Sequence, residues 1–182
     1  RDPEPLPPRA PASPGAAVLE LSGVSATDDR ALPALRDVTL DVRAGEIVGV
    51  AGVEGNGQTE LVEVIAGLRR AGAGSVRVLG RDARAASPAE LLDGGLAHIP
   101  GDRLHRGVIA EMSVAENVLL GRHREPRFSG PLGLDGAAIS AEAARVAETL
   151  DVRPRDPSVP LGSLSGGNQQ KAVVGRELGR AP

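Results

Sequence analysis

Residues 52–59 (GVEGNGQT) have the residue types and spacing of a segment that wraps around a phosphate group. They follow the phosphate-loop pattern G-x-x-x-x-G-K-[ST] at every fixed position except the lysine, which is Gln58. Such a loop needs glycine because several successive backbone N–H groups must point inward, which requires positive φ or close approach. Thr59 would place its hydroxyl on Mg²⁺. The candidate nucleotide-binding residues are Gly52, Gly55, Asn56, Gly57, Gln58 and Thr59.

The replacement of lysine by Gln58 changes the chemistry expected of this loop. A glutamine amide can donate a hydrogen bond but carries no charge, and charge-assisted bonds contribute about 1.5 to 3 kcal/mol against about 1 for neutral ones. We therefore expect nucleotide binding weakened about tenfold. Catalysis should suffer more, because charge grows on the transferring oxygens in the transition state. Taken alone, the segment could also be a tight turn without a ligand.

A second candidate anion site lies at residues 164–171 (LSGGNQQK), which lead into the helical sequence AVVGRELGRA. A serine and two glycines at the start of a helix offer free backbone N–H groups, a hydroxyl donor and the positive end of the helix dipole. Taken alone, the same residues are an ordinary helix N-cap. The candidate residues of this motif are Leu164, Ser165, Gly166, Gly167, Asn168 and Gln169.

The hydrophobic pattern predicts the elements that position these motifs. Residues 46–51 (EIVGVA) form a bounded, β-branched apolar run, which is typical of a strand buried on both faces. Residues 59–68 (TELVEVIAGL) have the apolar spacing of an amphipathic helix. Further strands are expected at residues 18–21, 38–42, 75–79 and 96–100.

Capping patterns predict helices in the second half of the chain. Residues 87–90 (SPAE) and 113–116 (SVAE) both have the spacing of a capping box. A longer helix is expected around residues 141–150. Residues 102–164 therefore resemble a helical insert beside an α/β core.

Composition narrows the classes of function. The 182 residues suit one domain, and they include one Phe but no Tyr or Trp, which disfavours stacking on nucleic-acid bases. The net charge of −3 provides no broad basic field for a phosphate backbone, so we expect no nucleic-acid partner. The absence of cysteine excludes disulfides and thiolate metal sites. No apolar run is long enough to span a bilayer, so a membrane role would require a partner.

Together the two motifs resemble those of the ABC transporter ATPases. Residues 164–167 (LSGG) match the family's signature motif, and the extension NQQK is similar to the simple-sugar and nucleoside importer branch. Further agreement lies at residues 43–46 (RAGE), 98–103 (HIPGDR) and 112–117 (MSVAEN), so the resemblance covers about residues 18–182. The loop sequence GVEGNGQ most resembles the second, degenerate nucleotide-binding domain of a tandem pair.

This resemblance implies a fold and its boundaries. The expected fold is an α/β P-loop NTPase core of the ABC ATPase type, with a small antiparallel β part and a helical signature subdomain. The family places the Walker B aspartate strand, the catalytic glutamate and the switch histidine after the signature helix. We therefore expect a chain truncated before them, with no assignable catalytic base. The expected parts are a Pro-rich linker at 1–16, a β-rich and P-loop core at 17–101, the helical subdomain at 102–164 and the signature helix at 165–182.

The resemblance also implies how the two motifs work. Domains of this family pair head to tail, so that ATP lies between the phosphate loop of one domain and the signature of the other. Ser165, Gly166 and Gly167 would then complete a site whose lysine belongs to an upstream nucleotide-binding domain of the same chain. Residues 52–59 would form the weaker site. The implied cofactors are ATP and Mg²⁺, with Thr59 as metal ligand, and this fragment alone is expected to be inactive.

At the level of function, the resemblance implies a transport ATPase at the cytoplasmic face of the membrane, peripheral to it. Its ATP hydrolysis would drive uptake of nucleosides or simple sugars through transmembrane permease subunits, supplied by a solute-binding protein. Residues 112–120 (MSVAENVLL) would form the coupling surface. The alternatives are a soluble ABC ATPase outside transport, which the NQQK extension disfavours, and a structural module without nucleotide.

Several residues depart from the family pattern or lack an assigned role. Gly101 stands where most members have the Q-loop glutamine, which puts the usual metal and water contact in doubt. No aromatic residue precedes the phosphate loop to stack on adenine, which fits a weak site. Arg103 and Arg106 could contact a partner, but a solvated charged loop is the plainer interpretation. The three histidines, His98, His105 and His123, show no metal-ligand spacing.

Overall fold

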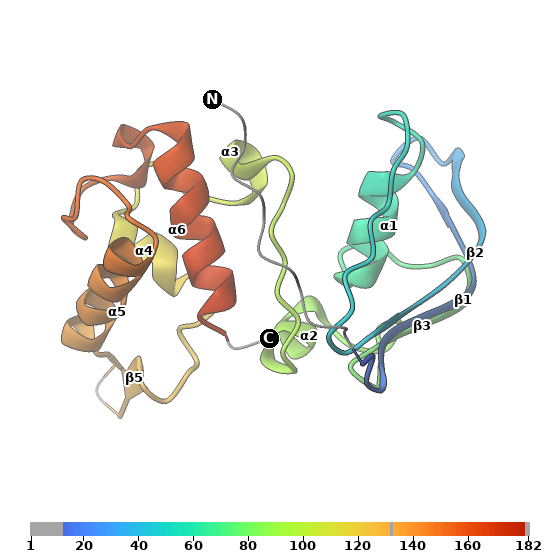
Figure 1. The fold of residues 1–182 in the computed structure, drawn as a ribbon, viewed down its shortest axis with the longest axis horizontal. Helices are drawn as coiled ribbons and strands as arrows, with labels where there is room; N and C mark the ends of the chain where they lie inside the picture. The colour runs from blue at the N-terminus through green and yellow to red at the C-terminus, as the bar shows by residue number, and fades with distance from the viewer. Residues whose placement is uncertain (1–12, 132, 181–182) are drawn as a thin grey trace. The chain divides into compact units, whose positions relative to one another are not determined.

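A computed structural model describes residues 13–131 and 133–180 (Figure 1). The chain forms two compact units that divide after Leu91. The β-rich unit comes first and the helical unit second. Most of the linker predicted at residues 1–16 lies outside the described residues.

The first unit is built on an antiparallel sheet of four strands in the order β2-β1-β3-β4. The central strand β1 (Ala17–Thr27) pairs with β2 (Pro33–Arg43) on one side and with β3 (Ala73–Val78) on the other. The two-residue β4 (Arg81–Asp82) pairs with β3. β1 is longer than the apolar run at residues 18–21, because backbone hydrogen bonds to β2 and β3 keep the residues beyond that run extended. The strands expected at 18–21, 38–42 and 75–79 are confirmed as parts of β1, β2 and β3.

One helix of this unit, α1 (Gln58–Ile65), packs against the sheet (Figure 1). Its amphipathic pattern buries Leu61 and Val64 on the sheet side. The helix expected at residues 59–68 is therefore confirmed in type. It ends earlier than expected because Gly67 has a φ of 72°, which a right-handed helix does not allow. The sheet contributes Leu21, Val24, Leu35, Val76 and Val78 to the core of this unit.

The strands predicted at residues 46–51 and 96–100 are wrong. Neither segment pairs as a strand with any other described residue, and Ile47 and Val50 are 80% and 57% exposed. An apolar β-branched run indicates burial between neighbours, but a strand forms only where adjacent backbone supplies hydrogen bonds. The described part of the chain supplies none here, so both segments lack regular secondary structure.

The second unit is helical. Its long helix α5 (Gly136–Thr149) confirms the helix expected around residues 141–150 and begins earlier, because the Asp135 carboxylate caps it by accepting the Ala138 N–H at 3.0 Å. Over the described residues, no helix combines the length and apolar character needed to cross a bilayer. The other elements are α2 (Pro88–Asp93), which spans the division between the units, α3 (Arg103–Arg106), α4 (Val114–Leu119), β5 (Ser129–Gly130), β6 (Gly133–Leu134), a 3₁₀ turn (Leu161–Ser163) and α6 (Gly166–Leu178).

Helices α4, α5 and α6 pack around one apolar core in this unit (Figure 1). The approach of α5 to α6 is close because α6 presents Gly175 at the crossing. A Cβ at this position would collide with Val146 and would lie 3.0 Å from the Leu150 side chain. The buried members of the core are Val114, Val118, Ala143, Val146, Ala147, Val152, Leu161, Leu164 and Ala172.

Both predicted capping boxes are confirmed. At the start of α4, the Ser113 hydroxyl accepts the Glu116 N–H at 3.2 Å, and the Glu116 carboxylate accepts the Ser113 N–H at 2.8 Å. The same reciprocal bonds join Ser87 and Glu90 at the start of α2. Hydrogen bonds from the Ser113 hydroxyl and N–H lower the pKa of Glu116, so this carboxylate stays charged at the positive end of the helix dipole.

A buried ion pair ties the end of the second unit together. The Arg122 side chain is fully buried, and it donates to the Glu142 carboxylate on α5 at 3.0 Å and to Glu125 at 2.8 Å. It also donates to the Gly179 carbonyl, just after α6, at 3.1 Å. A charge taken out of water must be paired in this way to be tolerated. Arg145 and Arg122 lower the pKa of Glu142 through their hydrogen bonds, although burial opposes the shift.

Candidate functional site

The loop of residues 52–57 connects directly to the start of α1. Gly55 and Gly57 have φ values of 85° and 97°, which lie in the left-handed region that favours glycine. Gly57 is constrained twice, because a Cβ there would also lie 2.6 Å from the Ala34 carbonyl oxygen on β2. The sequence pattern thus places glycine where the backbone of this loop needs it.

The Gln58 side chain folds back into the loop. Its Oε1 accepts the backbone N–H of Asn56 at 3.1 Å, and its Nε2 donates to the Val53 carbonyl at 3.0 Å. The Asn56 side chain donates to the same carbonyl at 2.9 Å. Gln58 also covers Gly52, since a Cβ on Gly52 would collide with Nε2. The amide at the lysine position therefore bonds to the loop itself.

Thr59 follows in the first turn of α1 and is exposed. Its hydroxyl has no hydrogen-bond partner within the described residues. Mg²⁺ is a hard cation that binds oxygen ligands, so the free hydroxyl of Thr59 fits the expected role of a metal ligand. Across residues 13–131 and 133–180, no group of three or more His, Cys, Asp or Glu side chains could hold a metal ion by itself.

The second motif forms the start of α6. Ser165 is the N-cap, with extended backbone angles of −60° and 153°, but its hydroxyl does not cap the helix. Instead it accepts the Asn168 side-chain amide at 3.1 Å. Ser165 and Gly167 are exposed, and the first N–H groups of a helix have no acceptor within it. The motif therefore presents its donors to the outside.

Three residues of the motif make structural contacts. Leu164 is 5% exposed and belongs to the core. Gln169 is buried, and its Nε2 donates to the Leu164 carbonyl at 3.0 Å, which ties the helix to the turn before it. Asn168 accepts the Arg153 N–H at 3.0 Å. These contacts fix the position of the start of α6, where the Ser165 hydroxyl and the first N–H groups of the helix are exposed.

Sequence reasoning missed the position of Arg103. Interpreting it as part of a solvated charged loop is wrong, because the residue is half-buried and its Nε is buried without a hydrogen-bond partner among the described residues. Its guanidinium lies against Gly166, where a Cβ would collide with it. No local sequence signal could have linked two residues so far apart in the chain.

The sequence profile of the ABC transporter family matches residues 35–182. The chain belongs to the ABC transporter family. The matched region contains both motifs, the glycine-rich loop at residues 52–59 and the start of α6. The family also implies nucleotide binding.

Among curated relatives of this ABC chain, the glucose import ATP-binding protein TsgD13 of Haloferax volcanii is 46% identical over 172 residues, which cover 93% of this chain and 31% of the relative. The guanosine import ATP-binding protein NupO of Bacillus subtilis is 39% identical, over 94% of this chain and 34% of the relative. The nucleoside import ATP-binding protein NupA of Lactococcus lactis is 41% identical, over 96% and 34%. The chain thus spans about a third of their length.

Solved structures show the same fold. A nucleotide-free ATP-binding cassette from an ABC transporter matches with a TM-score of 0.72 at 24% identity, over 92% of this chain and 66% of the other. The cassette MJ0796, in a post-hydrolysis dimer bound to ADP and Pi, matches with a TM-score of 0.70 at 22% identity, over 90% and 70%. The chain has the α/β fold of an ABC ATPase.

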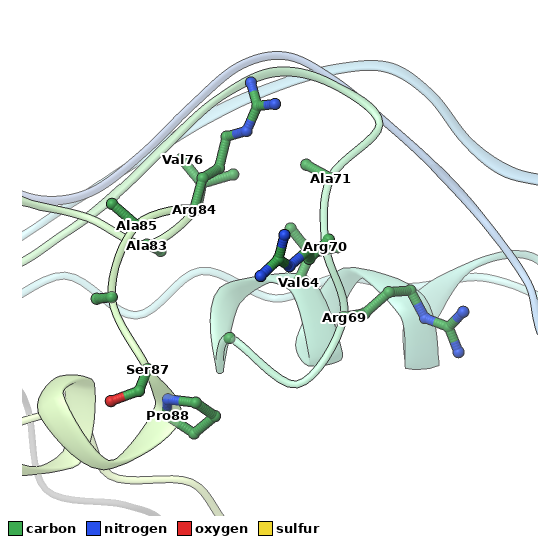
Figure 2. Close-up of a pocket in the computed structure, with 12 residues that line it drawn as sticks. Val64, Arg69, Arg70, Ala71, Val76, Ala83, Arg84, Ala85, Ser87 and Pro88 are labelled. Atoms are coloured by element: carbon green, nitrogen blue, oxygen red, sulfur yellow. The ribbon is translucent and has the colours of Figure 1, made fainter.

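The cavity shown in Figure 2 is lined by no residue of either motif of this ABC chain. It has a volume of about 320 Å³ and lies in the first unit, near the end of α1 opposite the phosphate loop. Figure 2 shows that Arg69 and Arg84, which line it, point away from one another. Arg69 donates to the Thr27 carbonyl at 2.8 Å, and Arg84 donates to that of Gly74 at 2.7 Å. Both arginines hold the sheet to its connections.

Proposed function

We propose that this chain is part of the ATP-binding subunit of an ABC importer, which drives uptake of a nucleoside or simple sugar. The observation that carries the proposal is the signature LSGGNQQK at the exposed start of α6. The names of the relatives, which are glucose, guanosine and nucleoside import ATP-binding proteins, support the same class of solute. They disfavour an ABC ATPase outside transport and a module without nucleotide.

In this proposal, the signature acts on ATP held by another phosphate loop. Ser165, Gly166 and Gly167 direct a hydroxyl and backbone N–H groups toward the γ-phosphate, where charge develops during transfer to water. The lysine and most other phosphate contacts come from an upstream nucleotide-binding domain of the same chain. Exposure of Ser165 and Gly167 supports a role in trans.

The phosphate loop of this chain is the weaker of the two sites in the proposal. Its backbone geometry suits a phosphate, and Thr59 would hold Mg²⁺, which neutralises charge on the phosphates when bound. Gln58 supplies no positive charge. The loop therefore binds nucleotide more weakly and contributes little to turnover.

The proposed partners are a transmembrane permease and a solute-binding protein, and the proposed location is the cytoplasmic face of the membrane, peripheral to it. Residues 112–120 are the proposed coupling surface. Met112 is 36% exposed and Ile109 is 40% exposed, while Asn117 fixes the loop between them by donating to both carbonyls at 3.1 and 2.9 Å. Met112 at the start of this segment and Ile109 just before it thus offer two partly exposed apolar side chains, on a loop fixed by hydrogen bonds, for docking of a partner helix.

The test of the proposed function is ATP turnover by the full-length protein carrying Gly166→Asp. A carboxylate at the signature repels the γ-phosphate, so turnover should fall at least about a hundredfold, as when other transition-state donors are lost. Gly166→Asn is the control for the collision of a Cβ at Gly166 with Arg103, and it should lose less turnover than Gly166→Asp because it adds no charge. Gly136→Asp is the control for a carboxylate at a helix start, because Gly136 is also the first residue of a helix and a Cβ there meets nothing within 4 Å. It should retain turnover within about twofold. Unchanged turnover with Gly166→Asp would refute the composite site.

A further inference from the structure

The phosphate loop already contains a hydrogen-bonding ligand. The carboxamide of Gln58 accepts the N–H of Asn56 at 3.1 Å and donates to the Val53 carbonyl at 3.0 Å. It also covers Gly52 so closely that a Cβ there would collide with it. We propose that this carboxamide is an internal ligand of the loop, which the phosphate of a nucleotide must displace. The inference rests on the proposed function of residues 52–59 as a phosphate loop.

The internal ligand competes with phosphate for the Asn56 N–H. A phosphate loop binds its anion through successive backbone N–H groups, and one of these, the Asn56 N–H, donates to the Gln58 oxygen. An amide oxygen satisfies an N–H donor as a phosphate oxygen does, but without charge. Binding a nucleotide therefore costs the two hydrogen bonds that Gln58 makes with the loop.

A lysine at this position would behave differently. Its ammonium group has three donors and no acceptor, so it could bond to the Val53 carbonyl but could not accept the Asn56 N–H. Glutamine does both, because its amide carries an acceptor and a donor. The side chain of Gln58 is also shorter than that of lysine, so it cannot remain on the loop and reach the outer phosphates. The substitution thus adds a competitor as well as removing a charge.

The two effects differ in what they predict for Gln58→Ala. If the missing charge alone weakens the site, alanine should bind nucleotide as weakly as glutamine or more weakly. If the carboxamide competes, alanine should bind it more tightly, because the Asn56 N–H becomes available. Releasing one or two neutral hydrogen bonds corresponds to roughly a two- to tenfold gain in affinity.

The test uses the full-length protein titrated with Mg²⁺ and AMP-PNP, a non-hydrolysable ATP analogue. Hydrogen exchange by mass spectrometry of peptides covering residues 52–65 reports this loop and α1 alone. The concentration giving half-maximal protection should fall about two- to tenfold in Gln58→Ala and further in Gln58→Lys, which adds charge. Without nucleotide, Gln58→Ala should lose protection at Asn56 and keep it in α1, which verifies that the unit is folded.

Val53→Ala is the matched control, because it shortens an exposed side chain of the same loop and leaves both Gln58 bonds, which go to backbone atoms, intact. It should not tighten binding. If Gln58→Ala binds AMP-PNP no more tightly than the wild type, while the nucleotide still protects the loop in Gln58→Lys, the internal ligand is wrong but the phosphate loop stands. Protection absent in every variant would overturn the phosphate loop as well. Turnover with Gly166→Asp tests the signature separately.

Discussion

At the scale of single residues, the most constrained charge in the described chain is Arg122. Its side chain is fully buried and bonds to Glu125, Glu142 and the Gly179 carbonyl. It also lies 5.1 Å from the centre of the Phe128 ring, close enough for a cation–π contact. These partners come from three parts of the second unit, so this one side chain links α5 to the residue that follows α6.

We expect Arg122→Met to lower the free energy of unfolding of the second unit by about 3 to 5 kcal/mol, because it leaves the Glu142 carboxylate buried with less compensation. The loss should shrink as the pH falls below about 4.3, the ordinary pKa of glutamate. The lowered pKa of Glu142 stabilises the fold above that value, and this contribution disappears as the carboxylate is protonated. Urea unfolding followed by hydrogen exchange in α5 and α6 measures both effects.

The control for this prediction is Arg145→Gln, which removes a partner of the same Glu142 from a side chain that is 54% exposed. Because water reaches the Arg145 end of this pair and Arg122 still compensates the buried Glu142 carboxylate, the control should cost less than Arg122→Met, about 1 kcal/mol. Equal losses in Arg122→Met and Arg145→Gln would show that burial of Arg122 does not set its contribution.

Residue-level prediction from sequence succeeded where the cause is local. The pattern GVEGNGQT predicted positive φ or close approach at its glycines, and Gly55 and Gly57 have positive φ. The folding of Gln58 onto its own loop and the contact of Arg103 with Gly166 were not predicted. Both depend on where backbone segments meet in three dimensions, and no spacing in the sequence carries that information.

At the scale of elements, short helices in this chain rely on their caps. The six-residue α4 is too short to be stable by propensity alone, so its capping box and its core contacts must hold it. Replacing Ser113 with alanine removes both bonds of its hydroxyl, one from the Glu116 N–H and one to the Glu116 carboxylate. We expect a loss of about 1 kcal/mol, seen as faster hydrogen exchange in α4.

Ser140→Ala is the control for the cap. Ser140 is an exposed residue inside α5, where alanine is the better helix former, so the change should be neutral or slightly stabilising. If Ser113→Ala affects α4 no more than Ser140→Ala affects α5, packing alone determines the helix.

The sequence predicted the helix caps correctly and the strands at residues 46–51 and 96–100 wrongly, because the two kinds of element depend on partners at different distances along the chain. A capping box is complete within four residues, so the sequence contains the whole interaction. A buried strand depends on neighbours that lie elsewhere in the chain, and its apolar pattern predicts burial only if they are present. In the described residues, Ile47 remains 80% exposed.

At the scale of the whole molecule, the central claim is that the signature of this chain acts on nucleotide bound by another domain. The chain covers about a third of its relatives' length, and this leaves room for such a domain in the parent protein. These 182 residues contain no cysteine, so a thiol placed at Ser165 is a specific reporter once any cysteine elsewhere in the full-length protein has been replaced by serine. Ser165 is exposed and can be reached by maleimide.

The most direct measurement is the rate at which maleimide modifies Ser165→Cys in the full-length protein, with and without MgATP. Each rate is measured with wild-type Gln58 and with Gln58→Glu, which places a negative charge in this chain's own loop and repels phosphate. The account predicts that MgATP protects the thiol equally in both, because the protecting nucleotide is bound by the other domain. Loss of protection with Gln58→Glu would contradict it, since the nucleotide on the signature would then belong to this chain's own loop.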